Sequence, residues 1–206
     1  MNYSPMGAFR RLVAGPDRRT TNADHETIHQ TIRRATAMLE ILWSRPEPSR
    51  LADVARAMAR GLSVIQGDAD IDLAGYPDDS FDYAILSQTL QTARAPDVVL
   101  DHLLRIGRRA FVSFPNFAQW RVRLSLLWGG RMPVTRQLPE RWYDTPNIHH
   151  LTIDDFRAYL NQRDIIVEGA WFLSGDRTRT AALANLLAQH AVFLLRRDGT
   201  NRRISG

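Results

Sequence analysis

The stretch RWYDTPNIHH, residues 141–150, holds the densest group of side chains that could transfer protons. Tyr143, Asp144, His149 and His150 share this loop and could act as general acids or bases, or form a substrate or partner surface. We expect no metal site, because adjacent histidines seldom point the same way and no third ligand stands at a suitable spacing. The alternative is structural: the aromatic residues anchor a lid and His150 caps a helix.

Polar residues also follow two expected strands. Asp68 and Asp70 come after the apolar run LSVIQG, and Ser87, Gln88 and Thr89 follow FDYAIL. The carboxyl ends of parallel strands form the ligand-binding edge of an open α/β sheet, so these side chains are candidates for one crevice. The alternatives are that GDAD is a solvated turn and that the two hydroxyl groups cap the next turn.

The stretch SFPNF, residues 113–117, closes the third expected strand at the same edge. Asn116 could therefore face the crevice, whereas Phe114 and Phe117 are of a kind found more often in the core. The sequence holds no G-x-S-x-G nucleophile elbow, so it supports no Ser/His/Asp triad. Ser87, Gln88 and Thr89 are better suited to position a ligand than to catalyse a reaction.

The elements that would carry these residues alternate between strands and helices from residue 61 onward. Thr152, with Asp155 three positions later, predicts a capping box, and Trp120, Leu124 and Leu127 form one apolar side of an amphipathic helix. Strands are expected over 62–69, 81–88, 108–116, 165–173 and 190–197, and helices over 95–107, 117–128, 151–164 and 180–188. This alternation predicts an α/β fold with parallel strands.

The first 60 residues differ in character. Two helices are expected there, over 25–43 and 50–61, with the breaker RPEPS between them. The apolar run from Met38 to Trp43 is expected to pack against the sheet, where a first strand would lie. We therefore divide the chain into an atypical segment 1–50, a domain 51–197 and a flexible tail 198–206.

The composition is that of a globular protein, with 44% hydrophobic and 24% charged residues. No apolar run approaches the roughly 18 residues needed to span a bilayer, no export signal opens the chain, and no Cys is present, so a cytoplasmic location fits best. All 27 basic residues are Arg. They are spread along the chain and interleaved with Asp, which disfavours nucleic acid as the partner despite a net charge of +5.

Four stretches together carry a resemblance to a known family: GLSVIQGDAD, FDYAILSQTLQ, LLRIGRRAFVSFPNFAQWRVRLSLLWGGRMPV and RWYDTPNIHHLTIDDF. From about Val54 to Arg197 the chain resembles the MetW family of methionine biosynthesis proteins, whose fold is that of class I S-adenosylmethionine-dependent methyltransferases. The resemblance implies a Rossmann-like, mostly parallel sheet flanked by helices, and a role beside the homoserine O-acyltransferase MetX. It also implies that Asp68, with Ala69 beside it, contacts the adenine of S-adenosylmethionine, and that Ser87 and Gln88 lie next to this cofactor.

One motif of the family is missing. A D-x-G-x-G loop would bring backbone amides to the methionine half of the cofactor, but here TIRRATAMLEILWSRPEP stands in its place, with a composition typical of a shifted reading frame or a rearranged gene start. We therefore expect N-terminal strands that are incomplete or replaced, weak cofactor binding, and a non-catalytic partner of MetX that contacts it through the segment from WGGRMPV to DTPNIH. Two rival functions stay open: a methyltransferase acting on a small molecule, and an Arg-rich nucleic-acid binder.

Overall fold

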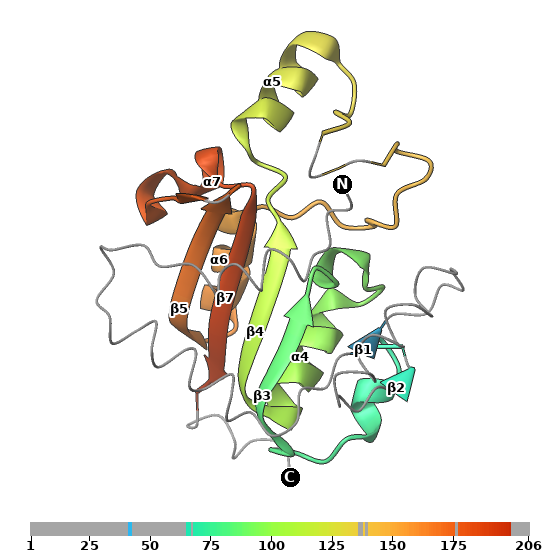
Figure 1. The fold of residues 1–206 in the computed structure, drawn as a ribbon. Helices are drawn as coiled ribbons and strands as arrows, with labels where there is room; N and C mark the ends of the chain where they lie inside the picture. Colours follow the sequence, from blue (N-terminus) through green and yellow to red (C-terminus); the bar gives the residue numbers. More distant parts are fainter. Residues whose placement is uncertain are drawn as a thin grey trace.

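The computed structural model describes residues 41–42, 65–66, 68–135, 138, 140–175 and 177–198 (Figure 1). The helix expected over 50–61, most of that expected over 25–43, and the tail beyond residue 198 lie outside the described residues, as does nearly all of the segment with the shifted-frame composition. The division of the chain at residues 50 and 197 stays a prediction. Within the described part, no helix is long and apolar enough to cross a membrane.

Five strands form the main sheet, in the order β3-β4-β7-β5-β6. β3 and β4 pair in parallel, whereas β7 runs antiparallel to both β4 and β5. Three strands, β3, β4 and β5, therefore share one direction, and the fold is α/β as predicted. The strands are β3 (Phe81–Ser87), β4 (Gly107–Pro115), β5 (Ile165–Ser174), β6 (Arg177–Thr178) and β7 (His190–Arg197).

The antiparallel β7 departs from the mostly parallel sheet that was expected, because of the connection that precedes it. A parallel strand would need a crossover from one end of the sheet to the other. The chain after β5 instead stays at the end where β5 stops, since Gly175 N donates to Gln189 Oε1 at 2.9 Å and Gln189 N donates to Leu173 O at 2.7 Å. The chain must then return in the opposite direction, and it inserts between β4 and β5.

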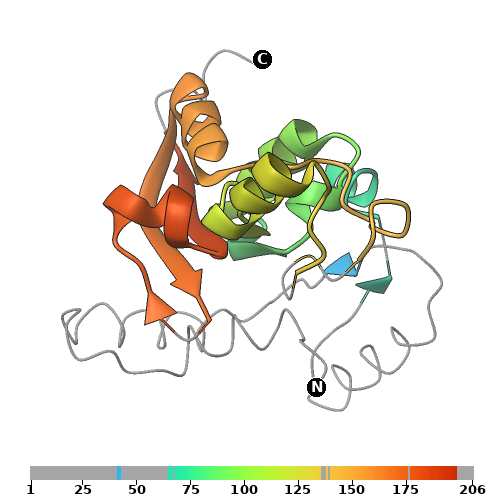
Figure 2. The same cartoon turned by 90° about the horizontal axis from the view of Figure 1, so that it is seen from above.

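Two helices, α4 (Pro96–Ile106) and α6 (Ile153–Gln162), cover one face of the sheet (Figure 2). Pro is well suited to the first turn of α4, because an amide there has no partner within the helix. The predicted capping box opens α6: Asp155 N donates to Thr152 Oγ1 and Thr152 N donates to Asp155 Oδ2, both at 3.1 Å. Both helices begin within two residues of their predicted starts.

The hydrophobic core lies between these helices and the sheet. The Phe114 ring centroid lies 4.8 Å from that of Phe156 and 5.9 Å from that of Phe193, so β4, α6 and β7 meet around aromatic side chains. At the start of β4, Gly107 allows β3 to approach closely, because a Cβ added there would lie 2.8 Å from the Cβ of Ala84. The helix α4 packs against both of these strands.

The remaining short elements connect these units. A 3-10 helix η1 precedes β3, η2 precedes α4, and η3 leads into the short helix α7 between β6 and β7. Their bounds are η1 (Asp72–Gly75), η2 (Leu90–Thr92), η3 (Ala181–Leu183) and α7 (Ala184–Leu187).

A second sheet pairs β1 (Ile41–Leu42) with β2 (Ile65–Gln66) in parallel, with Ile41 opposite Ile65. Residues 41–42 are therefore a strand and not the end of the expected helix over 25–43. Helix propensity is a weak influence, and a β-branched residue that finds a strand partner readily overrides it. The other residues of the apolar run from Met38 to Trp43 lie outside the described part of the chain.

The helix α5 (Trp120–Gly129) stands away from the sheet (Figure 1). Its single buried residue is Val122, which packs in a small cluster with Phe117 and Leu138. An amphipathic helix normally turns its apolar side to the core. On the predicted apolar side of α5, Leu127 is instead 74% exposed and Trp120 is exposed as well, whereas Leu124 is half-buried.

Charged side chains join β4, β7 and β5 at one end of the sheet. Glu168 on β5 accepts hydrogen bonds from Arg109 Nε at 2.6 Å and from Arg196 Nε at 2.8 Å. A register shift in β5 between Val167 and Gly169 accompanies this contact. Burial raises the pKa of Glu168, but the hydrogen bonds and charges of the two arginines outweigh it, so the pKa lies below its ordinary value.

Candidate functional site

Polar side chains meet at the carboxyl ends of β3 and β4. The two strands are parallel and Ser87 pairs with Ser113, so both strands end at one edge. Ser113 Oγ lies 3.4 Å from Ser87 Oγ, and Gln88 N donates to Ser113 O at 2.9 Å and to Ser113 Oγ at 3.2 Å. The structure therefore brings together two of the residues predicted for the cofactor, Ser87 and Gln88.

The backbone of Gln88 is in the left-handed region, with φ of 55°. This conformation is uncommon for a residue other than Gly, and it is maintained only where surrounding contacts over-determine it. The two bonds to Ser113 supply such contacts, and Gln91 Nε2 adds a third by donating to Gln88 O at 2.8 Å. Such backbone strain is common at ligand sites, which makes this turn the centre of the candidate site.

His190 also belongs to this site, although the sequence analysis did not single it out. It begins β7 opposite Pro115, and its Nδ1 lies 3.4 Å from Gln88 Nε2. Burial lowers the pKa of His190 to about 4, so its imidazole is neutral at neutral pH and a weak base. The available signal was its place at the start of an apolar strand, but that signal identifies the site only once the pairing of β7 with β4 is known.

The loop over 141–150 reaches the same site through Gln91 in η2. The carbonyl oxygen of Gln91 accepts hydrogen bonds from Ile148 N at 2.9 Å and from His149 N at 3.0 Å. His149 Nε2 and Gln91 Oε1 are both buried, and neither has a hydrogen-bond partner in the described part of the chain. Among the predicted residues of this loop, His149 is thus the one whose backbone bonds to Gln91, and the side chain of Gln91 in turn bonds to Gln88.

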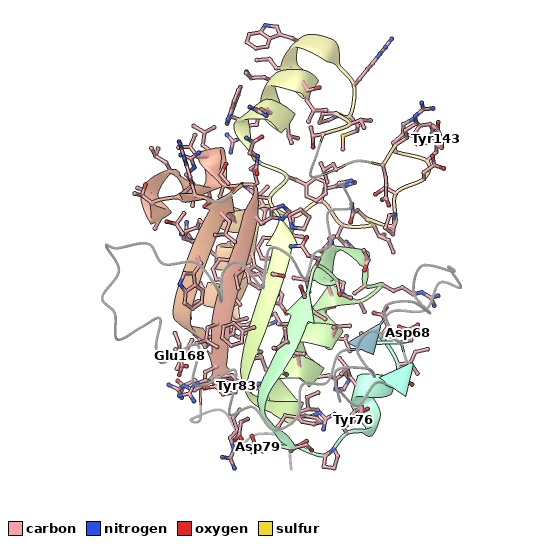
Figure 3. The ribbon with its side chains drawn as sticks, viewed as in Figure 1. Asp68, Tyr76, Asp79, Tyr83, Tyr143 and Glu168 are labelled. Carbon is pink, nitrogen blue, oxygen red and sulfur yellow. The ribbon has the colours of Figure 1, made fainter. Side chains whose placement is uncertain are left out.

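The other candidates of this loop lie apart from the site. Tyr143 and Asp144 are exposed, and Figure 3 shows Tyr143 on the outer part of the loop, away from the sheet. The ring of His150 packs edge-on against Phe117, with centroids 4.6 Å apart, and the cap of α6 is Thr152, so the expectation that His150 caps a helix is wrong. The loop therefore does not assemble its four ionisable side chains into one proton-transfer site.

Asp68 begins a compact turn that follows β2 (Figure 3). Its Oδ1 accepts from Asp70 N at 3.0 Å, and its own N–H donates to Asp72 Oδ2 at 2.6 Å. Ala69 is buried in the core. The carboxylate of Asp70 accepts from Arg94 N at 3.0 Å and from the next amide at 3.1 Å, just before α4, where a negative charge is favourable. Asp70 therefore has a structural role, and Asp68 is the better ligand candidate.

Asn116 was expected to face a substrate or partner, but the structure places it inside the protein. It is only 3% exposed. Its Nδ2 donates to the carbonyl oxygens of Asn185 and Ala188, both at 2.9 Å, and its Oδ1 accepts from Ala118 N at 3.1 Å and Ile153 N at 3.4 Å. Every hydrogen-bonding position of the amide is used inside the protein, so the side chain joins the end of β4 to α7 and to the start of α6.

The described site can bind a ligand more readily than it can transform one. Its hydroxyl, amide and neutral imidazole groups donate and accept hydrogen bonds, but among the described residues no carboxylate is a hydrogen-bond partner of Gln88. Within the described ranges no three His, Asp or Glu side chains gather as metal ligands. The arrangement suits a polar ligand held at the edge of the sheet.

Comparison with known proteins shows two sequence relationships. The sequence profile of the family described as methionine biosynthesis protein MetW matches residues 47–195. A bifunctional methionine biosynthesis protein MetXA/MetW from Rhodopirellula baltica is 36% identical over 143 residues, which is 68% of this chain and 23% of that protein. The chain thus spans about a quarter of the length of this curated relative.

Solved structures are similar at the level of the fold. The PH0226 protein from Pyrococcus horikoshii matches with a TM-score of 0.51 and 11% identity, over 84% of this chain and 77% of that one. A SAM-dependent methyltransferase from Thermotoga maritima matches with a TM-score of 0.49 and 16% identity, over 74% of this chain and 72% of that one. At such low identity a structural likeness supports a shared fold and not a shared reaction.

Proposed function

We propose a function from one premise, which is that this chain belongs to the MetW family of methionine biosynthesis proteins. Its class I methyltransferase-like α/β fold agrees with that membership. On this premise, the protein acts beside a MetX-type homoserine O-acyltransferase as a partner that binds the enzyme and alters its rate.

The observation that carries this proposal is the fused relative. The protein from Rhodopirellula baltica is described as a bifunctional MetXA/MetW protein. It is similar to this chain over 143 residues. Fusion of two modules makes their encounter intramolecular and raises the effective concentration of one at the other. Such a gain is useful when the two modules act together, which supports a partnership of the separate proteins as well.

The described site supports a binding role over a catalytic one. A general acid or base works best with a pKa near the operating pH. Burial holds the pKa of His190 at about 4, far from that range, and no carboxylate lies among the groups that hold Gln88. The described groups at this edge therefore offer hydrogen bonds but no efficient proton transfer near neutral pH.

A second candidate function is S-adenosylmethionine binding, for which Asp68 and the edge at Ser87 and Gln88 are the specific observation. Asp68 stands at the end of β2, with one carboxylate oxygen bonded to Asp70 N. The sequence, however, has no Gly-rich loop to supply amides to the methionine half of the cofactor. The residues present therefore match only half of the cofactor, and we propose that any binding is weak and does not support methyl transfer.

Co-expression with the acyltransferase of the same organism tests the proposal. The chain should be recovered with the enzyme by affinity capture of either protein, and the rate of acyl transfer should differ between the free and the bound enzyme. An acyltransferase that neither co-purifies nor changes its rate would exclude the partnership. The proposal also places the protein in the cytoplasm with that enzyme, which cell fractionation would test.

Binding to a nucleic acid would be distinguished by the dependence of its affinity on salt. Phosphate contacts release counterions, so affinity for nucleic acid would fall steeply with salt concentration. We expect no retention of the chain on single- or double-stranded DNA or on RNA at 150 mM salt, roughly physiological ionic strength. Tight binding that weakens about a thousandfold between 50 and 200 mM salt would favour this rival.

A further inference from the structure

The helix α5 presents an apolar stripe to solvent. Trp120, Leu124, Leu127 and Trp128 follow one another at spacings of four, three and one residues, so at about 100° per residue they occupy one side of the helix. We call these four residues the α5 stripe. Leu127 and Trp128 are 74% and 77% exposed, Trp120 is 39% exposed, and Leu124 is half-buried. Two large side chains so fully exposed on one helix turn are unusual, because such groups are normally buried.

The way in which α5 is anchored explains why the α5 stripe faces outward. Val122 lies about 200° around the axis from Trp120, so it is on the opposite side, and it is this residue that packs against Phe117 and Leu138. Both helix ends are also closed: Gln119 Oε1 accepts from Arg121 N at 3.0 Å, and the amide after the last residue donates to Leu126 O at 3.0 Å. The helix is therefore anchored on the side of Val122, and the α5 stripe, on the opposite side, can contact another surface.

Arginines border the α5 stripe on both sides. Arg121 and Arg123 lie at about +100° and −60° from Trp120 around the axis, and both are exposed. The guanidinium of Arg121 lies 5.2 Å from the Trp120 ring centroid, in a cation–π contact. Arg131, two residues beyond the end of the helix, is exposed as well. Trp, Met and Arg are the residue types enriched at protein interfaces, and Trp and Arg are enriched among their strongest contacts.

We propose that the α5 stripe is the docking element of this chain and that it lies in an apolar groove of the acyltransferase partner, with acidic side chains on the walls of that groove. This inference rests on the proposed function, because it names the surface used for that partnership. Recognition of this kind places anchors at positions i, i+4 and i+7 of a helix into a groove, which is the spacing of Trp120, Leu124 and Leu127. The exposed arginines supply the charge that acidic walls would complement.

Charge favours this partner over a second copy of the chain. A two-fold dimer places the same patch against itself, so the arginines that border the α5 stripe would face one another. Like charges brought together across an interface weaken association. The groove of a different protein with the opposite charge avoids this repulsion.

Binding of the full-length chain to the purified acyltransferase tests the inference by titration calorimetry. Trp128→Ala combined with Leu127→Ala should raise the dissociation constant at least tenfold, because the anchors of an interface contribute most of its affinity. The matched control is Leu183→Ala, which truncates a side chain that is 51% exposed on η3, and it should leave the constant within about twofold. Arg121→Glu should slow the association of the chain with the acyltransferase and make the association rate less dependent on salt concentration.

Four outcomes are decisive. If the double variant keeps the melting temperature of the parent chain and loses affinity while the control does not, the inference stands. Parent and double variant that bind equally well would overturn the α5 stripe as the docking surface and leave the partnership intact, whereas a parent chain that does not bind would overturn the partnership as well. A parent chain that forms dimers in sedimentation, abolished in the double variant, would make a second copy the occupant and overturn the inference.

Discussion

Replacing Asn116 by Ala should destabilise the protein strongly, although the sequence made this residue a candidate for the surface of a binding site. The buried amide makes four hydrogen bonds to backbone groups, at 2.9, 2.9, 3.1 and 3.4 Å. Each such bond contributes about 1 kcal/mol net, and a buried group left without a partner costs about 1 to 3 kcal/mol. We therefore expect Asn116→Ala to lower the free energy of unfolding by about 3 to 5 kcal/mol.

Urea denaturation followed by circular dichroism measures this loss. With a slope near 2 kcal/mol per molar urea, the transition midpoint should fall by about 1.5 to 2.5 M. Asn161→Ala is the matched control, because Asn161 is exposed near the end of α6, and its effect should stay within about 0.5 kcal/mol. Equal midpoints for the two variants would refute the internal role of Asn116, and Asn116 would again be a candidate to face a ligand.

Three further predictions concern other parts of the molecule. Gly107→Ala should destabilise by about 1 to 3 kcal/mol in the same urea assay, because the new Cβ would lie 2.8 Å from the Cβ of Ala84; an unchanged midpoint would contradict this packing. The pKa of Glu168 is lowered in the folded state, so the stability that Glu168 contributes is present above the ordinary carboxyl pKa of about 4.3 and is lost as the pH falls through the folded value. The stability difference between the parent and Glu168→Gln should therefore shrink as the pH falls below about 4, and a difference independent of pH would refute the assignment. S-adenosylmethionine should bind no more tightly than the millimolar range, because the loss of about three charged-group hydrogen bonds removes roughly 5 to 9 kcal/mol; a micromolar constant in titration calorimetry that is lost in Asp68→Ala would show a complete site.

What the sequence could predict depended on how local each feature is. The capping box of α6 involves only Thr152 and Asp155, three residues apart, so its signal is complete within one turn. The direction of β7 depends on a connection that closes through Gln189, and no local pattern reports it. The periodicity of α5 revealed an apolar side but not where that side faces, since this depends on the contact of Val122 with distant residues. The burial of Asn116 was hidden for the same reason: three of its four hydrogen-bond partners lie far along the chain.

The partnership with a homoserine O-acyltransferase is tested most directly by titrating that enzyme with this protein and following the rate of acyl transfer. Purified full-length chain is added in increasing amounts to a fixed amount of purified acyltransferase while the initial rate of acyl transfer is recorded. If the two proteins act together, the rate changes with added chain and reaches a plateau at a fixed molar ratio, and light scattering detects a complex of both proteins at that ratio. A rate that stays constant up to a large excess of the chain, with the two proteins eluting separately, would contradict it.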